Sequence, residues 1–327
     1  MAAPLPRKRL IAIGCVALAL APGTWLRSDP VAERSGRIAF SALAEIDKPA
    51  ELGGFIRKGV WQIASPDMDF GGFSALVLLP DNELLAFSDR GFIMRFARPG
   101  SAAEGEAAIA PLADRGRFER FLPDIESATR STANGDVWLG FEAGNIVGRF
   151  SAKGRQEAAR RPREWRGWPG NSGPEAMARL PDGRFLILPE ASRTGVLHPG
   201  DPTMDAPARQ FAFSVPEDYA PTDMTALPDG RVLVLLRKTV VAFPPFSAAL
   251  GIADPTDLDQ GERLEIRKLV DLDRILPREN YEGLAVEAGE DGAVTLWIIS
   301  DDNIASFQRT LLAQLSWQPR RKSAPEP

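Results

Sequence analysis

Carboxylates recur at two fixed positions of a diverged repeat in this chain. The first position lies at the head of a short apolar run, and the second lies at the end of the apolar run after the next turn. The first column reads Ser74, Glu126, Glu175, Asp223 and Glu282, and the second reads Asp89, Glu142, Glu190, Arg237 and Asp301. Eight of these ten positions are acidic, although Asp and Glu together make up only 44 of the 327 residues. Since equivalent positions of a repeat form a ring or a row in space, we expect these carboxylates to gather in one place.

Carboxylates at such close range repel one another unless some are protonated or neutralised by a cation. Calcium is suited to this role because it takes about six to eight oxygen ligands, whereas Mg²⁺ prefers fewer ligands from the protein. Zn²⁺ and copper are disfavoured because the chain has a single cysteine, Cys15, and a single histidine, His198. We predict that the metal ligands are Asp89, Glu126, Glu142, Glu190, Asp301, Asp302 and Asn303.

The same ring could support hydrolysis of an ester. A bound metal would polarise the ester and activate water, while a carboxylate accepts a proton. We predict Glu175 and Glu282 as the catalytic carboxylates. Three cations that follow or flank the two columns, Arg90, Arg237 and Arg309, are the predicted substrate-binding residues. A serine–histidine mechanism is disfavoured, since no G-x-S-x-G elbow is present and His198 lies in a turn-like sequence, with its ring expected in solvent.

A purely structural alternative is open for the same residues. Acids at strand ends can accept hydrogen bonds from the backbone of the next repeat and thereby fasten neighbouring units together. Arg237 and Arg90 would then be ion-pair partners of the acids.

The elements around these residues are predicted to be short β-strands. The turn LPDG occurs at 180–183 and again at 227–230, and its glycine supplies the positive φ that tight hairpins need. The strands after the turns, such as 185–188 and 232–236, are continuous apolar runs, which is typical of strands covered on both faces. The units recur every 48 to 59 residues, as expected for four-stranded blades.

We therefore predict an all-β propeller of six four-stranded blades, with five or seven as alternatives. Five units are visible, and a sixth would be built partly from residues 37–60. The terminal segments RIAFSAL and LLAQLSW are expected to pair and close the ring.

Several of these segments resemble a known family. GGFSAL followed by LLAFSDRG, then DIES, NSGPEAMA, NYEGLAVE and SDDN, are similar to the bacterial phytase-like family, described as a domain with esterase-like activity of phytase. The resemblance covers residues 52–318 and implies a β-propeller. Any one of these motifs alone is weakly specific, whereas SDRG, NYEGLA and SDDN together are fairly specific.

The ends of the chain differ from its body. Basic residues at 7–9 precede an apolar run, which predicts a signal peptide or an N-terminal anchor over 1–27 and an exported protein, periplasmic or secreted. Cys15 also allows a lipoprotein reading. A linker over 28–36, a propeller over 37–318 and a disordered tail over 319–327 follow. A formal net charge of −5 gives no reason to expect nucleic acid as a partner, and the membrane is a partner only through that anchor.

The predicted function is a metal-dependent hydrolase that acts on a small-molecule phosphate or carboxylic ester at the acidic mouth of a propeller channel. Two alternatives remain. One is a non-catalytic binding or scaffold propeller with structural Ca²⁺, and the other is a metal-dependent lactonase.

Overall fold

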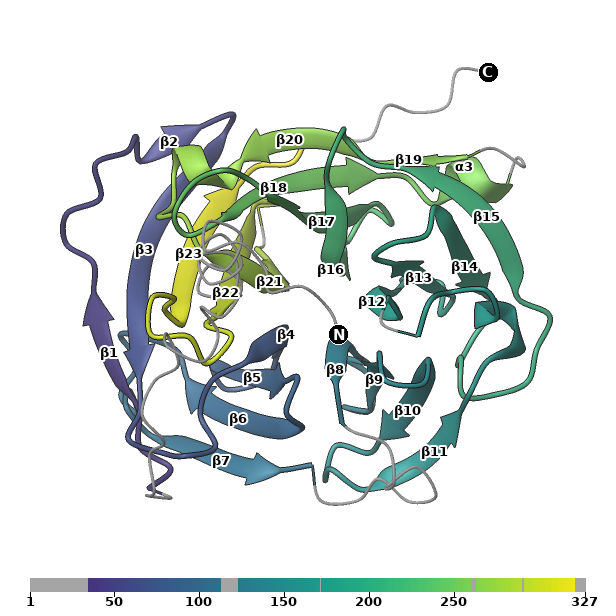
Figure 1. Cartoon of the computed structure of the whole chain (residues 1–327), viewed down its shortest axis with the longest axis horizontal. Coiled ribbons are helices and arrows are strands. Elements are labelled where there is room, and N and C mark those ends of the chain that lie inside the picture. Colours follow the sequence, from purple (N-terminus) through teal and green to yellow (C-terminus); the bar gives the residue numbers. More distant parts are fainter. Residues whose placement is uncertain (1–34, 113–122, 171, 260–262, 290, 321–327) are drawn as a thin grey trace, which may run out of the picture.

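A computed structural model describes residues 35–112, 123–170, 172–259, 263–289 and 291–320 of the chain. Five sheets surround a central axis as the blades of a β-propeller, and Figure 1 shows the five inner strands around the middle of the ring. The predicted signal peptide or anchor, nearly all of the linker and most of the tail lie outside the described residues. Among those described, no helix is long and apolar enough to span a membrane.

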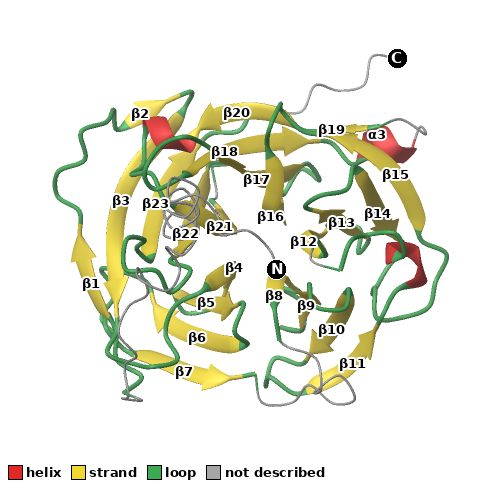
Figure 2. Cartoon of the chain, viewed as in Figure 1, coloured by secondary structure: helices red, strands yellow, loops and turns green. Residues whose placement is uncertain are grey.

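The first two blades are four-stranded antiparallel meanders. Each begins at the axis and ends at the periphery, as Figure 2 also shows. Blade 1 comprises β4 (Phe73–Leu78), β5 (Glu83–Ser88), β6 (Phe92–Ala97) and β7 (Ala107–Pro111). Blade 2 comprises β8 (Ile125–Arg130), β9 (Val137–Phe141), β10 (Ile146–Phe150) and β11 (Gln156–Arg160).

The next two blades are linked at their outer edges, because β19 leaves the fourth blade and pairs in parallel with β15 of the third. Blade 3 comprises β12 (Pro174–Arg179), β13 (Phe185–Pro189), β14 (Thr194–His198), β15 (Arg209–Ser214) and β19 (Leu264–Glu265). Blade 4 comprises β16 (Ala220–Ala226), β17 (Val232–Thr239), β18 (Phe246–Ala253) and β20 (Arg267–Asp271). The short helices are α3 (Thr256–Asp259) and the 3₁₀ turns η2 (Arg163–Trp165) and η3 (Leu272–Arg274).

The fifth blade joins both ends of the described chain. Its strands are β21 (Asn280–Ala288), β22 (Val294–Asp301), β23 (Leu311–Trp317), β3 (Phe55–Ala64), β1 (Ala39–Ala42) and β2 (Glu51–Leu52). The predicted pairing partner of LLAQLSW was wrong, since β23 pairs with β3 while RIAFSAL contributes β1, on the outer side of β3. The predicted sixth blade was wrong for the same reason: residues 39–64 extend the fifth sheet and form no sheet of their own.

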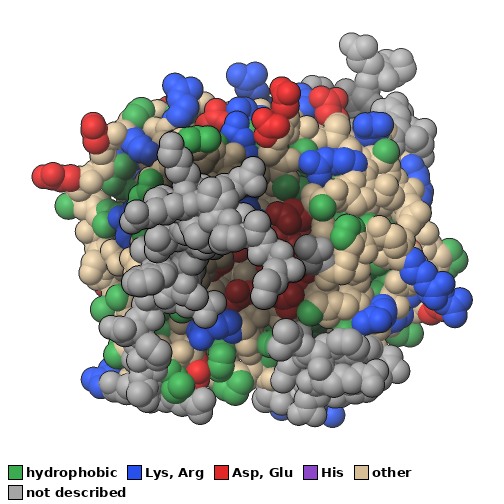
Figure 3. Space-filling model, viewed as in Figure 1, with side chains coloured by type: hydrophobic (Ala, Val, Ile, Leu, Met, Phe, Trp, Pro, Cys, Tyr) green, Lys and Arg blue, Asp and Glu red, His purple; other side chains and the backbone are tan. Residues whose placement is uncertain are grey.

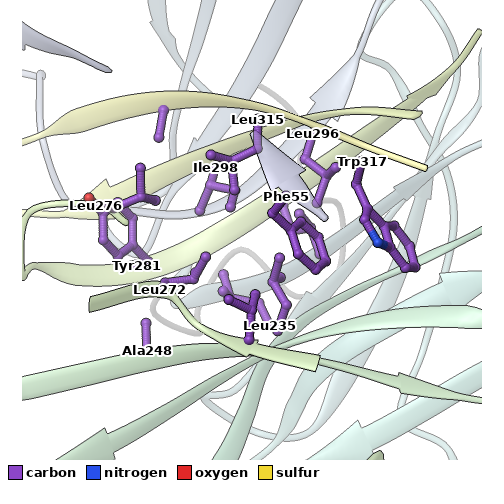
Figure 4. Close-up of a cluster of buried hydrophobic side chains, with 14 of the residues drawn as sticks. Phe55, Leu235, Ala248, Leu272, Leu276, Tyr281, Leu296, Ile298, Leu315 and Trp317 are labelled. Carbon is purple, nitrogen blue, oxygen red and sulfur yellow. The ribbon is translucent and has the colours of Figure 1, made fainter. Parts of the chain in front are cut away.

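The apolar core lies between neighbouring blades, which explains why the strands are apolar on both faces. Figure 4 shows one such cluster, in which Leu235 and Ala248 of blade 4 face Tyr281, Ile298 and other residues of blade 5. Phe55 and Trp317 stack at 4.9 Å between ring centroids in the same cluster, on the two strands that close the ring. Each fully buried large apolar side chain contributes about 1.5–3 kcal/mol. Blade contacts thus fix the inner strands around the channel.

The two LPDG turns are confirmed as equivalent hairpins. In blade 3, the Gly183 N–H donates to the Leu180 carbonyl, and in blade 4 the Gly230 N–H donates to the Leu227 carbonyl. Both glycines have positive φ, at 90° and 86°. Each of these turns follows the last residue of an inner strand, β12 or β16, at one end of the channel. The first residues of the inner strands therefore lie at the other end.

Candidate functional site

Every inner strand carries a β-bulge close to its first residue. The bulged positions are Ser74, Glu126, Glu175, Thr222 and Glu282. A bulge re-aims a side chain and is common next to functional sites. Three of the five strands therefore present a glutamate at the same level of the channel.

The position assigned to Asp223 was wrong by one residue, because Thr222 occupies the bulge and Asp223 pairs with Leu235. The Asp223 carboxylate is fully buried and accepts hydrogen bonds from the N–H groups of Met224 (2.7 Å) and Leu284 (2.6 Å). Leu284 lies in β21, so this carboxylate fastens blade 4 to blade 5. The structural alternative therefore holds for Asp223.

The second column lies in register across the blades. The N–H of Asp89 donates to the Gly72 carbonyl, and that of Glu142 donates to the Asp124 carbonyl, both at 2.9 Å. Asp301 pairs with Asn280 at the equivalent place in blade 5. The other two members are Arg237, which pairs with Ala220, and Glu190, which follows the last residue of β13.

Blade 2 contributes a compact group of three carboxylates, Asp124, Glu126 and Glu142, which we call the blade 2 corner. One carboxylate oxygen from each lies within 4.8 Å of the others. Burial, followed by the charge of Asp124, raises the pKa of Glu142 to about 7. Burial, followed by the charges of Glu175 and Glu282, raises the pKa of Glu126 well above its ordinary value. No described cation forms an ion pair with these three side chains. A hydrogen bond between the Asp124 and Glu142 carboxyl groups relieves only part of their repulsion.

Glu175, from the bulge of blade 3, lies next to this corner. Its side chain is 6% exposed, and its Oε2 atom has no hydrogen-bond partner among the described residues. Burial, followed by the charges of Glu190 and Glu282, raises the pKa of Glu175, against a smaller opposing effect of Arg237. A buried oxygen without a partner is unfavourable, which indicates a missing cation, proton or water.

On the other side of the channel, Arg237 neutralises part of the ring, and we call its surroundings the blade 4 corner. The guanidinium donates to Glu190 (2.9 Å), to Asn280 Oδ1 (3.0 Å) and to Glu282. Burial lowers the pKa of Arg237, but the charges of Glu282 and Glu190 more than offset burial and raise it. Arg237 is thus a permanent internal cation for two of the predicted site residues.

The turn after β22 places Asp301 in the ring and Asp302 in a structural role. Burial, followed by the charges of Glu282 and Asp89, raises the pKa of Asp301 well above its ordinary value. The Asp302 carboxylate accepts hydrogen bonds from the Gly72 N–H (3.1 Å) and the Thr310 hydroxyl (2.9 Å). Asn303 is exposed at the tip of this turn.

The other two predicted substrate-binding arginines are engaged elsewhere. Arg90 donates to the Phe70 carbonyl at 2.7 Å and lies over the Phe92 ring. Arg309 donates to the buried carboxylate of Glu279 at 2.6 Å. Of the three, Arg237 alone forms an ion pair with predicted ring carboxylates in the described structure.

The expectation for His198 was wrong. Its ring is 1% exposed, and Nδ1 lies 2.8 Å from the Gly200 carbonyl oxygen. It is a core residue at the end of β14.

The acidic side chains are visible at the centre of the molecule. In Figure 3, Asp and Glu side chains line a hollow in the middle of the face that looks down the channel. The charges of Glu175 and Glu282 raise the pKa of Glu126, and the charge of Asp89 raises the pKa of Glu282. These four residues belong to four different blades, so their carboxylates lie close enough to repel one another. The predicted convergence of distant carboxylates on the axis is therefore present.

Sequence reasoning missed Asp124 and Asn280, which stand two residues before the bulges of blades 2 and 5. The equivalent positions elsewhere are Gly72, Gly173 and Ala220. An alignment of the positions two residues before the first column would have found both polar residues.

Comparison with known proteins identifies one family. The sequence model of the phytase-like family, described as esterase-like activity of phytase, matches residues 68–304. A search of curated protein sequences finds no significant match. Among solved structures, a luciferin-regenerating enzyme is similar with a TM-score of 0.46 at 11% identity, over 89% of this chain and 91% of that one. A protein of unknown function from Bacteroides thetaiotaomicron has a TM-score of 0.48 at 12% identity, over 89% of this chain and 75% of that one.

Proposed function

The chain belongs to the phytase-like family of β-propellers, and we propose that it is a divalent-cation-dependent hydrolase of phosphate or carboxylic esters. One observation carries the proposal. The buried, unpartnered Oε2 of Glu175 lies among charged carboxylates, next to three that have oxygens within 4.8 Å of one another.

The donor set fits a hard cation. Asp124, Glu126 and Glu142 offer only oxygen, and a cation between them would relieve the repulsion that raises their pKa values. Asp89 would complete the coordination from the neighbouring blade 1, with Glu190 and Asp301 as further candidates. Calcium suits this number of carboxylates better than Mg²⁺ does. Asp302 and Asn303 remain predicted ligands that would need the turn after β22 to rearrange.

When bound, the cation would polarise the ester and lower the pKa of a coordinated water. The remaining work falls to the protein's own side chains. Glu175 has a free carboxylate oxygen with a raised pKa, which suits acceptance of the proton from attacking water. Glu282 is held by Arg237 and Asn280 and would keep the charge of the opposite wall fixed.

The substrate class follows from the charges around the channel. Arg237 is the ring's own cation, and it is shared between Glu190 and Glu282. A densely phosphorylated molecule would require more cations than this mouth offers. A simple phosphate monoester or a carboxylic ester is therefore the proposed substrate.

A chelator assay with small reporter substrates tests the proposal. The purified protein is given nitrophenyl phosphate, nitrophenyl acetate and a γ-lactone, first with EGTA and then with added Ca²⁺. We expect turnover of one ester to stop in EGTA and to return with Ca²⁺. Glu175→Gln should lower kcat about a hundredfold, as expected for loss of a general base. Turnover that persists in EGTA or in Glu175→Gln would refute the proposed mechanism.

A matched control is Glu157→Gln on the outer strand β11, where Glu157 forms an ion pair with the exposed Arg155. This variant should retain full activity. Selective turnover of the lactone would identify the protein as a lactonase with the same site.

A second candidate is a binding or scaffold propeller in which Ca²⁺ is structural. It is favoured by the origin of the ring residues in separate blades, because a cation held between them would join those blades at the axis. In that case EGTA lowers the melting temperature and none of the three substrates is hydrolysed.

Export to the periplasm or the exterior is part of the proposal. It rests on the basic residues at 7–9 and the apolar run after them, and fractionation of cells that express the full chain would test it.

A further inference from the structure

The end of the channel opposite to the carboxylates contains a cavity of about 660 Å³. All five blades line it with the ends of their inner strands and the turns that follow. The wall is formed by residues 76–80, 128–130, 179–181, 224–228 and 284–286, with Thr132 and Ala288. Cavities of about 300–1,000 Å³ are typical of sites for small molecules.

This cavity is separate from the proposed hydrolytic site. In β12, Glu175 is the second residue and Arg179 is the last. At about 3.3 Å per residue, the four intervening steps of an extended strand span about 13 Å. A molecule in the cavity would therefore lie a substantial distance along the axis from Glu175.

The charge of the cavity wall is entirely positive among the described residues. Arg130 and Arg179 are its charged lining residues, and the remainder are apolar residues and threonines. No described carboxylate forms an ion pair or a hydrogen bond with either guanidinium. Two half-buried arginines without a carboxylate partner in one otherwise apolar cavity can accept an anion.

The two arginines come from neighbouring strands that are fastened together. The Arg179 N–H donates to the Thr129 hydroxyl at 3.1 Å, which joins β12 to β8 beside the cavity. Each guanidinium packs against the glycine in the turn of its own hairpin. A methyl group added to Gly135 would lie 3.4 Å from Arg130 Nη2, and one added to Gly183 would lie 3.9 Å from Arg179 Nη2. The backbone around both side chains is thus fixed by tight turns and by a bond between blades.

We propose that this mouth binds a small organic oxyanion, a carboxylate or a phosphate on an apolar body. The guanidinium groups match the paired oxygens of either head group. The apolar body would contact side chains such as Leu76, Met224 and Leu284, which line the same cavity. This site is independent of the hydrolase proposal, because none of its residues belongs to the carboxylate ring.

The charge arrangement along the axis supports the assignment. Without a bound divalent cation, the far end holds at least seven carboxylates against Arg237 and repels an anion that approaches from that side. The arginine end attracts the same anion. An anionic ligand would therefore enter the channel through the Arg130–Arg179 mouth.

Calorimetric titration of the full chain tests this site. The probes are hexanoate, hexylphosphonate, which has no ester bond to be hydrolysed, and the neutral hexanol. We expect one of the two anions to bind with a stoichiometry of one and hexanol to bind at least about tenfold more weakly, as expected for loss of a charge-assisted contact. Whichever anion binds more tightly identifies the head group. Absence of binding by both anions at millimolar concentration would overturn the proposal.

Variants locate the binding. Arg130→Gln and Arg179→Gln should each raise the Kd about tenfold, and the double variant should abolish binding. If the Gln variants do not fold, Arg130→Lys and Arg179→Lys keep the charge and should show weakened but measurable binding. Arg155→Gln, an exposed control, should leave the Kd unchanged, and so should Glu126→Gln in the carboxylate ring. Full binding by the folded double variant, or loss of binding in Glu126→Gln, would place the anion elsewhere and refute the site.

Discussion

The blade 2 corner and the blade 4 corner face each other across one channel, yet they handle buried charge in opposite ways. In blade 4, Arg237 forms ion pairs with Glu190 and Glu282, so the charge is balanced within the protein. In blade 2, Asp124, Glu126 and Glu142 crowd together with no described cation beside them. The difference shows that carboxylates at equivalent positions of a repeat can be neutralised by the protein itself or left without a counterion. The blade 2 corner is therefore where a bound cation would neutralise the most negative charge.

Removal of Arg237 should have the largest effect. Arg237→Met leaves the buried carboxylate of Glu282 and the partly exposed carboxylate of Glu190 without their counterion. We expect the free energy of unfolding to fall by about 3 kcal/mol or more in the presence of EGTA. Urea unfolding at constant pH measures this change. Arg155→Met, which removes an exposed ion pair, should change stability by less than about 0.5 kcal/mol. Equal stabilities of the two variants would mean that the blade 4 corner is not held by Arg237.

Neutralisation of the blade 2 corner should act on cation binding. Glu126→Gln removes one of three clustered carboxylates, so the Kd for Ca²⁺ should rise about a hundredfold, a change of about 2.7 kcal/mol. Isothermal titration with Ca²⁺ gives the value. An unchanged Kd would show that the cation binds outside this corner and would contradict the comparison.

Asp223 offers a sharper test, because its carboxylate lies between blades 4 and 5 and already accepts two backbone hydrogen bonds. The two carboxylate oxygens of Asp223 each accept a hydrogen bond from one backbone N–H group. Asp223→Asn replaces one of these oxygens by an NH₂ donor, and we expect the free energy of unfolding to fall by about 2 kcal/mol. The Kd for Ca²⁺ should stay as it is in the unmodified protein. A weaker Kd would mean that Asp223 is part of the cation site after all.

The smallest effect concerns pH. Burial and neighbouring charges raise the pKa of Glu142 to about 7, above its ordinary value of 4.5. The folded protein therefore holds a proton that the unfolded chain has already lost, so in EGTA stability falls as pH rises from about 4.5 to about 7. We expect a lower melting temperature at pH 8 than at pH 5, by about 2 °C or more, in calorimetric scans. Saturating Ca²⁺ should remove this slope, because a bound cation neutralises the same carboxylates. A melting temperature that rises over this range in EGTA would contradict the shift.

The repeat in the sequence predicted the fold and most of the ring because the hairpin turns fix where each strand begins and ends. The second column, from Asp89 to Asp301, could be aligned from the turns alone. Asp223 was misplaced because the alignment shifted by one residue in blade 4, where Thr222 stands at the bulge. The blade count failed at residues 39–64, since nothing in their sequence states whether they form a sheet or join one.

The chemistry of individual side chains was less predictable. The lone oxygen of Glu175 and the two ion pairs of Arg237 depend on how side chains from different blades meet, which no local pattern encodes. The arginines at the far mouth were missed for the same reason. Arg130 and Arg179 are ordinary strand-end residues until the blades place them in one cavity.

The pairing of β3 with β23, which closes the ring, has a consequence for how the protein folds during synthesis. One of its strands lies near the start of the described chain and the other at its end, so a partly synthesised polypeptide has four potential blades but no closed circle. Until residue 317 emerges, β3 presents an unpaired edge that can associate with another chain. Deletion of the last strand should therefore yield aggregates, and the ring carboxylates would acquire their mutual spacing only in the final step of folding.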